Sequence, residues 1–316
     1  MSIQLNSYRE KNNTKAVLIF LGSLLPFLTL MVLCLVLIQH SILWVLFFTW
    51  PLHWFHARLF VIMHDCGHHS FTSSAKLNNL IGHTCGFFFL TPFLLWRQLH
   101  NRHHLHQGNL DRRGISLDVW LLTKSEYQNA HSIVKLSYRF YRNPAILFLL
   151  SPLVLFGGLF RLPFEYFPLK ARLNIWILNF IYFLFAFQLL SGSSASVILA
   201  FIPFMLLSFS LAAWLFYIQH TFEKTLWLKD SEFQNREIAL HGSSYYQLPR
   251  FLNWMTANIG FHHVHHLDTQ IPLYRLRQAH DELILNEVVE SLDFYKSFET
   301  SNLKLWDENK RKLIGF

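Results

Sequence analysis

Charged residues are scarce in this chain of 316 residues. They make up 15% of it, whereas 52% of the residues are hydrophobic and the mean hydropathy is +0.26. This balance excludes an ordinary soluble domain and is typical of an integral membrane protein. The chain also lacks internal repeats, low-complexity tracts and linkers, so we expect one membrane domain over residues 1–316.

Cysteine is equally sparse. Cys34, Cys66 and Cys85 form an odd, widely spaced set that provides neither a disulfide framework nor a CxxC motif. We therefore expect reduced thiols. The polar N-terminus lacks a cleavable signal pattern, and the apolar run at residues 16–38 is too long for the core of a signal peptide. That run predicts a permanent membrane span.

Basic residues outnumber acidic ones, 27 to 19, and the formal net charge is +8. In a soluble protein this excess would suggest a nucleic-acid partner. Here the basic residues lie in loops beside apolar segments, where membrane topology and anionic lipid headgroups account for them. We expect a lipid bilayer and no nucleic acid as a partner.

Six apolar segments divide the chain. A helix needs about 20 apolar residues to cross about 30 Å of hydrocarbon, and the first two and last two segments meet that length. The third and fourth are shorter and are interrupted by glycine and proline, which indicates re-entrant or interfacial segments. In chain order the six segments are residues 16–38, 41–62, 79–95, 144–161, 172–190 and 195–218.

Lysine and arginine set the predicted topology. They are frequent in 97–142 and 161–172, and absent from the links at 39–41 and 191–195. The positive-inside rule then places the N-terminus and the basic segments on the cytoplasmic side. This predicts four spans and a cytosolic cap made of residues 63–142 and 219–316. Within that cap, the mixed helical periodicity of residues 276–296 predicts one amphipathic helix.

Three dense histidine clusters lie just beyond apolar segments, and the predicted topology brings them to one face. Residues three and four apart share a helix face, so we expect the second and third clusters each to offer three imidazoles to a common centre. The first offers an i, i+4 pair with one histidine on its flank. Two such triads and a third group predict a site for two metal ions. The clusters contain His64, His68 and His69; His100, His103 and His104; and His262, His265 and His266.

The type of metal is less tightly fixed by these residues. Closed structural zinc sites usually use four ligands, often cysteines; this set is larger, and the HExxH motif is absent. Imidazole suits zinc, copper, iron and nickel. The membrane context favours iron, because attack on an unactivated C–H bond of a lipid chain requires a metal–oxygen oxidant. His220 closes the last span at the same face and is a further candidate ligand.

The sequence resembles the membrane fatty acid desaturases over about residues 45–280. HDCGHHSF, the WRxxHxxHH run, GNLDRRG and GFHHVHHLDTQIP look like the bacterial acyl-lipid, delta-12 or omega-6-like branch. The resemblance implies an all-α membrane fold with four spans and a helical cap that holds a di-iron site. It also implies that His68 or His69 joins His64 and the other cluster histidines as ligands, and His220 fits the place of an additional one.

The resemblance further implies a reaction. Molecular oxygen and two electrons would convert two methylenes of an acyl chain, linked to a glycerolipid, CoA or an acyl-carrier protein, into a cis double bond. A separate ferredoxin-, rubredoxin- or cytochrome b5-type donor is needed, because no HPGG-type haem motif is present. We expect a bacterial inner membrane and an active site on the cytoplasmic side. Asp65, Asn109, Asp111 and Asp268 are candidate acceptors for the distal N–H of ligand rings.

Other functions remain compatible with parts of this pattern. A hydroxylase, an acetylenase or a carotenoid-modifying enzyme would carry the same histidine boxes. A b-type cytochrome would place paired histidines inside facing spans, and a transporter would place polar ligands near the midplane of the membrane. The clusters lie beyond the ends of the spans, which argues against both of these non-enzymatic classes.

Overall fold

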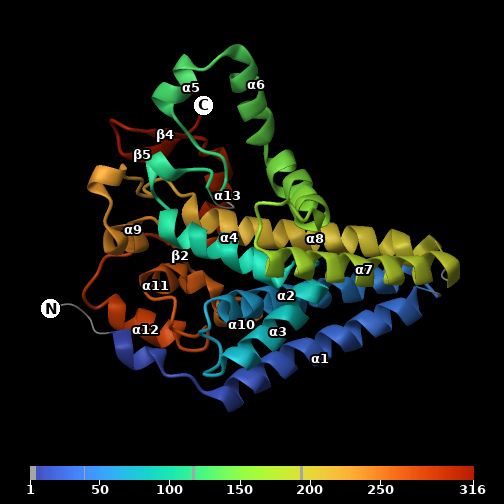
Figure 1. Ribbon diagram of the computed structural model, residues 1–316. Helices are drawn as coiled ribbons and strands as arrows, with labels where there is room; N and C mark the ends of the chain where they lie inside the picture. The colour runs from blue at the N-terminus through green and yellow to red at the C-terminus, as the bar shows by residue number, and fades with distance from the viewer. Residues whose placement is uncertain (1–4, 39, 116–117, 193–194) are drawn as a thin grey trace. The chain divides into compact units, whose positions relative to one another are not determined.

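The structure is a computed structural model that describes residues 5–38, 40–115, 118–192 and 195–316. It is mostly helical (Figure 1). Among the described residues, four helices are long and apolar enough to cross a membrane, which confirms the predicted class of fold. They are α1 (Asn13–Leu37), α2 (Ile42–Gly67), α7 (Leu169–Gly192) and α8 (Ala195–His220).

The chain divides into two compact units, which are described separately. Unit 1 consists of Met1–Lys11, Gln98–Leu147 and Trp214–Phe316. Unit 2 consists of Asn12–Arg97 and Phe148–Ala213, and it contains most of the membrane-length helices.

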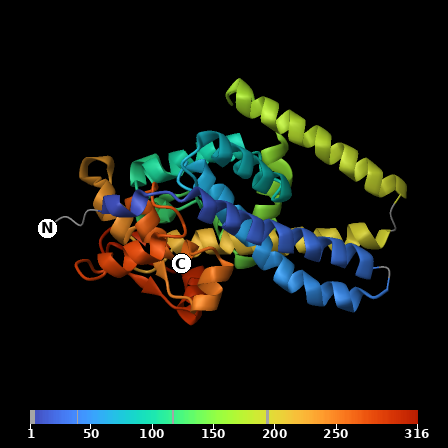
Figure 2. The same ribbon diagram turned by 90° about the horizontal axis from the view of Figure 1, so that it is seen from below.

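Local polar groups start the helices of unit 2. The side chains of Asn12 and Ser41 accept hydrogen bonds from backbone N–H groups in the first turns of α1 and α2, and Ser74 does the same for α3 (Ala75–Phe88). Such caps satisfy backbone donors that have no partner within the helix. α1 packs along α2 (Figures 1 and 2), and α3 packs against α2 from another side.

A sharp bend follows α3. The axes of α3 and α4 (Phe93–His106) differ by 101°. Glycines permit the close approach at this bend: a Cβ atom on Gly82 would lie 2.4 Å from the Phe93 ring, and one on Gly86 would lie 2.6 Å from the Thr91 carbonyl oxygen. A bent pair is a broken span or a re-entrant segment, and the re-entrant assignment of 79–95 stays a prediction.

The second interrupted segment, 144–161, is not a regular α-helix. It forms π-helical turns η3 (Ile146–Leu150) and η4 (Leu153–Gly158), followed by the 3-10 turn η5 (Leu159–Arg161). Pro152 and the glycine pair at 157–158 lie in or beside these turns, which agrees with their known effect on helix regularity.

Unit 1 combines short helices with two small sheets, so the cap is not purely helical. Its α-helices are the end of α4, α5 (Lys124–Asn129), α6 (Ser132–Tyr141), the end of α8, α9 (Asn235–His241), α10 (Arg250–Met255), α11 (His262–Leu267), α12 (Leu276–Leu283) and α13 (Phe294–Glu299). Its 3-10 turns are η1 (Leu5–Arg9), η2 (Leu110–Arg112), η6 (Asp230–Glu232), η7 (Ile259–Phe261) and η8 (Thr300–Asn302).

The strands join segments of unit 1 that lie far apart in the sequence. β1 (Leu122–Thr123) pairs in parallel with β4 (Leu305–Asp307), which pairs antiparallel with β5 (Lys312–Ile314). β2 (Tyr245–Tyr246) pairs in parallel with β3 (Ser291–Leu292). A small apolar core lies beside the first sheet and contains Leu110, Leu121, Trp227, Trp306 and Leu313.

The prediction of one helix over residues 276–296 is wrong. α12 ends at Leu283, and the side chains of Leu285 and Val288 are 78% and 80% exposed. The chain then enters β3, where the backbone of Tyr245 donates to the Glu290 carbonyl and that of Gln247 donates to the Leu292 carbonyl. These strand hydrogen bonds, formed with a distant segment, replace the helical ones.

The N-terminal segment of unit 1 is fastened to the region after the third histidine cluster. Tyr8 in η1 donates to the Glu282 carboxylate on α12, and Arg9 pairs with Asp268. Arg275 in turn pairs with Glu10. These polar contacts connect residues 8–10 to α12 and to the loop between α11 and α12.

Candidate metal centre

Three helices of unit 1 present the histidines of the second and third clusters. α4 carries His100, His103 and His104, α11 carries His262, His265 and His266, and α8 ends at His220 (Figure 1). One ring nitrogen from each of His103, His220, His262 and His266 lies within 4.8 Å of all the others. The last residue of a membrane-length helix is thus grouped with two separate histidine clusters.

The distances within this group are short. The Nε2 atom of His220 lies 3.1 Å from that of His103 and 3.1 Å from that of His262, which lies 3.1 Å from the His266 Nε2 atom. Two nitrogens bound at about 2.1 Å to one ion, at an angle of about 90–110°, are about 3.0–3.4 Å apart. The spacing therefore fits four imidazoles around one ion.

A second set of rings lies beside the first in unit 1. The Nε2 atom of His104 lies 3.0 Å from that of His100 and 3.1 Å from that of His265. The rings of His104 and His266 are stacked with centroids 4.2 Å apart, which connects the two sets. Unit 1 by itself thus arranges seven imidazoles in two adjacent groups.

The distal nitrogens show which ring atoms are available to a cation. The Nδ1 atom of His103 bonds the Asp118 carboxylate, and that of His220 lies 3.1 Å from the Gly242 carbonyl oxygen. A carbonyl and an ionised carboxylate only accept, so both Nδ1 atoms carry the proton and both Nε2 atoms carry a lone pair. Two lone pairs facing each other at 3.1 Å repel unless a cation lies between them, so this donor set fits a metal ion.

Burial supports the same protonation state. His103 and His265 are fully buried, and His220 and His262 are nearly so. Burial, followed by the nearby His262, holds the pKa of His266 well below its ordinary value. Because metal-binding imidazole must be neutral, the ring of His266 is held in the form that binds a metal.

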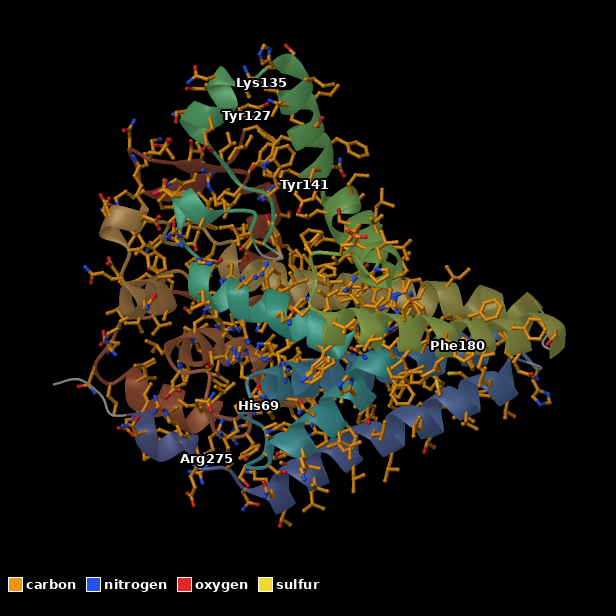
Figure 3. All side chains as sticks on the ribbon, in the orientation of Figure 1. His69, Tyr127, Lys135, Tyr141, Phe180 and Arg275 are labelled. Carbon is orange, nitrogen blue, oxygen red and sulfur yellow. The ribbon has the colours of Figure 1, made fainter. Side chains whose placement is uncertain are left out.

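The first histidine cluster lies in unit 2, at the end of α2. His64 and His68 are buried, with ring centroids 5.1 Å apart, and the His64 Nδ1 atom lies 3.4 Å from the Asp65 carboxylate. His69 (Figure 3) has a left-handed backbone, with φ of 56°, and its Nε2 atom accepts a hydrogen bond from Arg97 at 3.3 Å. The adjacent residues His68 and His69 therefore have different surroundings: His68 is buried beside His64, whereas His69 accepts from Arg97.

Comparison with known proteins assigns the family. The family model described as "Fatty acid desaturase" matches residues 39–297, which is well over half of the chain. The chain belongs to the fatty acid desaturase family. The desaturase is accordingly an O2-dependent oxidoreductase with membrane-length helices, and the resemblance drawn from its histidine boxes is confirmed.

Individual relatives agree with this assignment. A protein named "Fatty acid desaturase" from Bacillus subtilis (strain 168) is 35% identical over 314 residues, covering 99% of this chain and 89% of the relative. An "sn-1 oleoyl-lipid 12-desaturase" from Synechocystis is 29% identical, covering 71% of this chain and 64% of the relative. An "sn-1 acyl-lipid omega-3 desaturase (ferredoxin)" from the same organism is 29% identical, covering 76% and 69%.

The structure corrects the residues expected to support the ligand rings of the desaturase. Asp111 accepts from the backbone of Asp230, and Asn109 donates to the carboxylate of that same residue. Asp268 pairs with Arg9. Of the four expected acceptors, Asp65 contacts a cluster histidine, His64.

Two acceptors that hold rings in unit 1 are Asp118 and the Gly242 carbonyl, and sequence reasoning identified neither. Asp118 lies 15 residues after His103, beyond the turn at η2, and no helical spacing connects the two. A backbone carbonyl such as that of Gly242 has no sequence signal at all. The Gly242 carbonyl also accepts from the Gln107 side chain at 3.3 Å, which fixes its direction.

The buried His263 has a different partner from its neighbours in the third cluster. Its Nε2 atom lies 2.9 Å from the His280 Nδ1 atom on α12. Burial, followed by the His280 charge, lowers the pKa of His263 to about 3. In the desaturase, His263 thus contributes to the packing between α11 and α12. This agrees with its position outside the i, i+3, i+4 triad of His262, His265 and His266.

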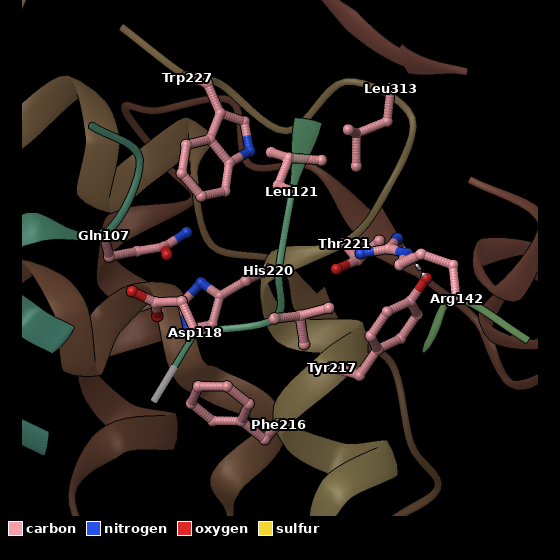
Figure 4. A pocket seen from close by; sticks show the side chains of 11 residues that line it. Gln107, Asp118, Leu121, Arg142, Phe216, Tyr217, His220, Thr221, Trp227 and Leu313 are labelled. Carbon is pink, nitrogen blue, oxygen red and sulfur yellow. Dashed lines mark hydrogen bonds between the residues drawn. The ribbon is translucent and has the colours of Figure 1, made fainter. Parts of the chain in front are cut away.

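Within unit 1, a small pocket adjoins the group of His103, His220, His262 and His266, which we call the first metal group (Figure 4). Asp118 and His220 line one side, and Phe216 and Tyr217 of α8 line another. The buried guanidinium of Arg142 also contributes to the wall. The remaining lining residues are Gln107, Val119, Leu121, Thr221, Trp227 and Leu313.

Proposed function

We propose that this desaturase introduces a cis double bond into the acyl chain of a membrane lipid, using O2 and two electrons at a centre of two iron ions. The facing lone pairs of His103 and His220 are the observation that supports a metal centre most directly. Two relatives whose names specify sn-1 acyl or oleoyl lipids support a lipid-linked substrate.

We propose that the ligands form two sets. His103, His220, His262 and His266 hold one ion, as their mutual spacing supports. His100, His104 and His265 contribute to the other, as their spacing supports. We also propose His64 and His68 of the first box as ligands, as the sequence predicts. His69 is the weaker ligand candidate of that box because its Nε2 atom accepts from Arg97.

The overall reaction balances as follows: O2, two electrons, two protons and a –CH2–CH2– unit give –CH=CH– and two water molecules. When bound, two iron ions would supply the redox chemistry between O2, the donor and the acyl chain. The protein's residues keep the imidazoles oriented. Asp118 and the Gly242 carbonyl hold the protons on the Nδ1 atoms, so each Nε2 lone pair points inward.

A separate protein supplies the electrons in this proposal. A ferredoxin is our first candidate because one relative's name specifies it; a rubredoxin or a cytochrome b5-type protein are the alternatives. We further propose a bacterial inner membrane with the metal centre on the cytoplasmic side. The distribution of lysine and arginine between the loops supports that orientation.

The function is tested by lipid analysis of a desaturase-deficient bacterial host. We expect the wild type to produce a new unsaturated chain, whose double bond is located by gas chromatography after derivatisation. His103→Ala should abolish the product, whereas His131→Ala, at an exposed position before α6, should not. If the product is a hydroxylated chain or a modified carotenoid instead of an alkene, the protein is a hydroxylase or a carotenoid-modifying enzyme and this proposal is wrong. Equal product from wild type and His103→Ala would overturn the ligand assignment.

A further inference from the structure

Asp118 is an acidic side chain that contacts a ring of the His103, His220, His262 and His266 group. Its carboxylate bonds the Nδ1 atom of His103, a ring that is fully buried and whose Nε2 atom lies 3.1 Å from that of His220. The Asp118 side chain is only 10% exposed. A carboxylate held in this way makes imidazole a stronger electron donor and restricts rotation of its ring.

Two neighbouring rings of the same group therefore have different supports. His220 gives its distal N–H to the neutral Gly242 carbonyl, whereas His103 gives its own to a carboxylate. A hydrogen bond to an ionised acceptor is about twice as strong as one to a neutral acceptor. Of these two rings, His103 is consequently the one whose donor strength depends on an acidic side chain.

Asp118 lines a small pocket together with a buried cation. Arg142 lines the same pocket and is almost completely buried. Its guanidinium donates to the carbonyls of Trp120 and Leu303 and to the Tyr217 hydroxyl. These partners hold the guanidinium in the wall of the pocket that Asp118 also lines.

We propose that Asp118 is a positioning residue of the metal centre. It locks His103 in the Nδ1–H tautomer, strengthens the Nε2 atom as a ligand, and thereby sets the affinity of this histidine group for its ion. The inference rests on the proposed function, because it requires that His103 binds a metal. It adds a residue from outside the three histidine boxes to the determinants of that site.

The test is an anaerobic titration of the purified, metal-free full-length protein with ferrous iron, which measures two dissociation constants. Removing such a partner typically weakens metal binding about 10–100-fold. We expect Asp118→Asn to weaken binding of one of the two ions by this factor and to leave the other unchanged. Asp118→Glu, which restores the charge, should recover most of the affinity.

A matched control lies in the same loop. Asp111 accepts from the Asp230 backbone, so Asp111→Asn should bind both ions as the wild type does. Thermal unfolding of the metal-free variants separates a folding defect from a binding defect. If Asp118→Asn also unfolds at a lower temperature than the wild type, recovery of iron affinity by Asp118→Glu supports the proposal. If Asp118→Asn and Asp118→Glu both bind iron as tightly as Asp111→Asn does, the proposal is overturned.

His103→Ala distinguishes this inference from the proposed function. If that variant loses one ion while Asp118→Asn keeps both at wild-type affinity, the metal centre stands and the role of Asp118 is refuted. If the wild type itself binds no iron, the proposed function fails and the inference fails with it.

Discussion

The two units hold their functional groups in place by different forces. In unit 2, phenylalanine rings of separate segments pack on one another: Phe89 lies 4.5 Å from Phe60 and 5.3 Å from Phe156, which stacks on Phe209 at 4.8 Å. In unit 1, buried imidazoles and cations are held by directional hydrogen bonds, as in the contact of His220 with the Gly242 carbonyl.

This difference follows from the surroundings of each unit. Membrane-length helices have apolar neighbours, so close contact positions them, and their few polar groups are paired nearby, as His53 is with Ser208 at 2.9 Å. A metal site instead requires defined directions for lone pairs, which only hydrogen bonds provide. We therefore expect unit 1 to be sensitive to lost polar atoms and unit 2 to added volume.

The largest effect is expected in unit 1, from removal of one imidazole. His262→Ala deletes a ring whose Nε2 atom lies 3.1 Å from two others, and we expect activity to fall by more than about 100-fold because a lost ligand costs more than a lost outer partner. His263→Gln, one residue away, should retain the metal. Product formation and iron content check this, and equal losses in both variants would contradict it.

The next largest effect is expected in unit 2, from one added methyl group. A Cβ on Gly82 would overlap the Phe93 ring at 2.4 Å, whereas one on Gly22 has nothing within 4 Å. Gly82→Ala should destabilise the protein by about 1–3 kcal/mol through overpacking, and Gly22→Ala should be neutral or slightly stabilising. The unfolding temperatures of the two variants in detergent are compared. If Gly82→Ala unfolds at the wild-type temperature, the α3–α4 bend can accommodate the added methyl group.

A smaller effect in unit 1 depends on pH. Burial, followed by the Arg142 charge, lowers the pKa of Lys304 to about 8, and its ammonium donates to the Arg142 carbonyl. Between pH 8 and the ordinary lysine pKa the unfolded chain binds more protons, so stability should rise with pH across that window. Lys304→Met should lessen this rise, measured by thermal unfolding, and the exposed Lys310→Met should not.

The smallest effect is expected from the ion pair between Arg9 and Asp268. The Arg9 side chain is 52% exposed, and exposed pairs contribute about 0–1 kcal/mol. Arg9→Ala should therefore lower the unfolding temperature only slightly, and less at high salt. A loss comparable to that of Gly82→Ala would mean that the N-terminal segment is essential to the region after α11.

Much of the architecture could be predicted from the sequence because its signals are local. An apolar run long enough for a membrane predicts a helix wherever it lies, and the runs beginning at 16 and 41 became α1 and α2. The i, i+3, i+4 spacing on α4 and α11 likewise places the three histidines of each cluster on one side of its helix. It does not bring each triad to a common centre, because His103 lies in one group and His100 and His104 in the other.

The helix expected at 276–296 shows where such reasoning stops. Leu276 and Leu283 obey a helical spacing and are buried, but the same apparent periodicity beyond them competes with strand pairing to Tyr245. The outcome depends on a segment more than 40 residues away in the sequence, which no local pattern includes.

The sequence by itself determined the membrane helices, the three histidine boxes and the family to which the chain belongs. Tertiary structure alone decided which rings share a group, since His103 and His220 meet across 117 residues, and which atoms orient them. The physical reason is that spacing along a helix fixes only the face on which a ring lies. The partner of its distal nitrogen, whether Asp118 or a backbone carbonyl, is set by how distant segments pack.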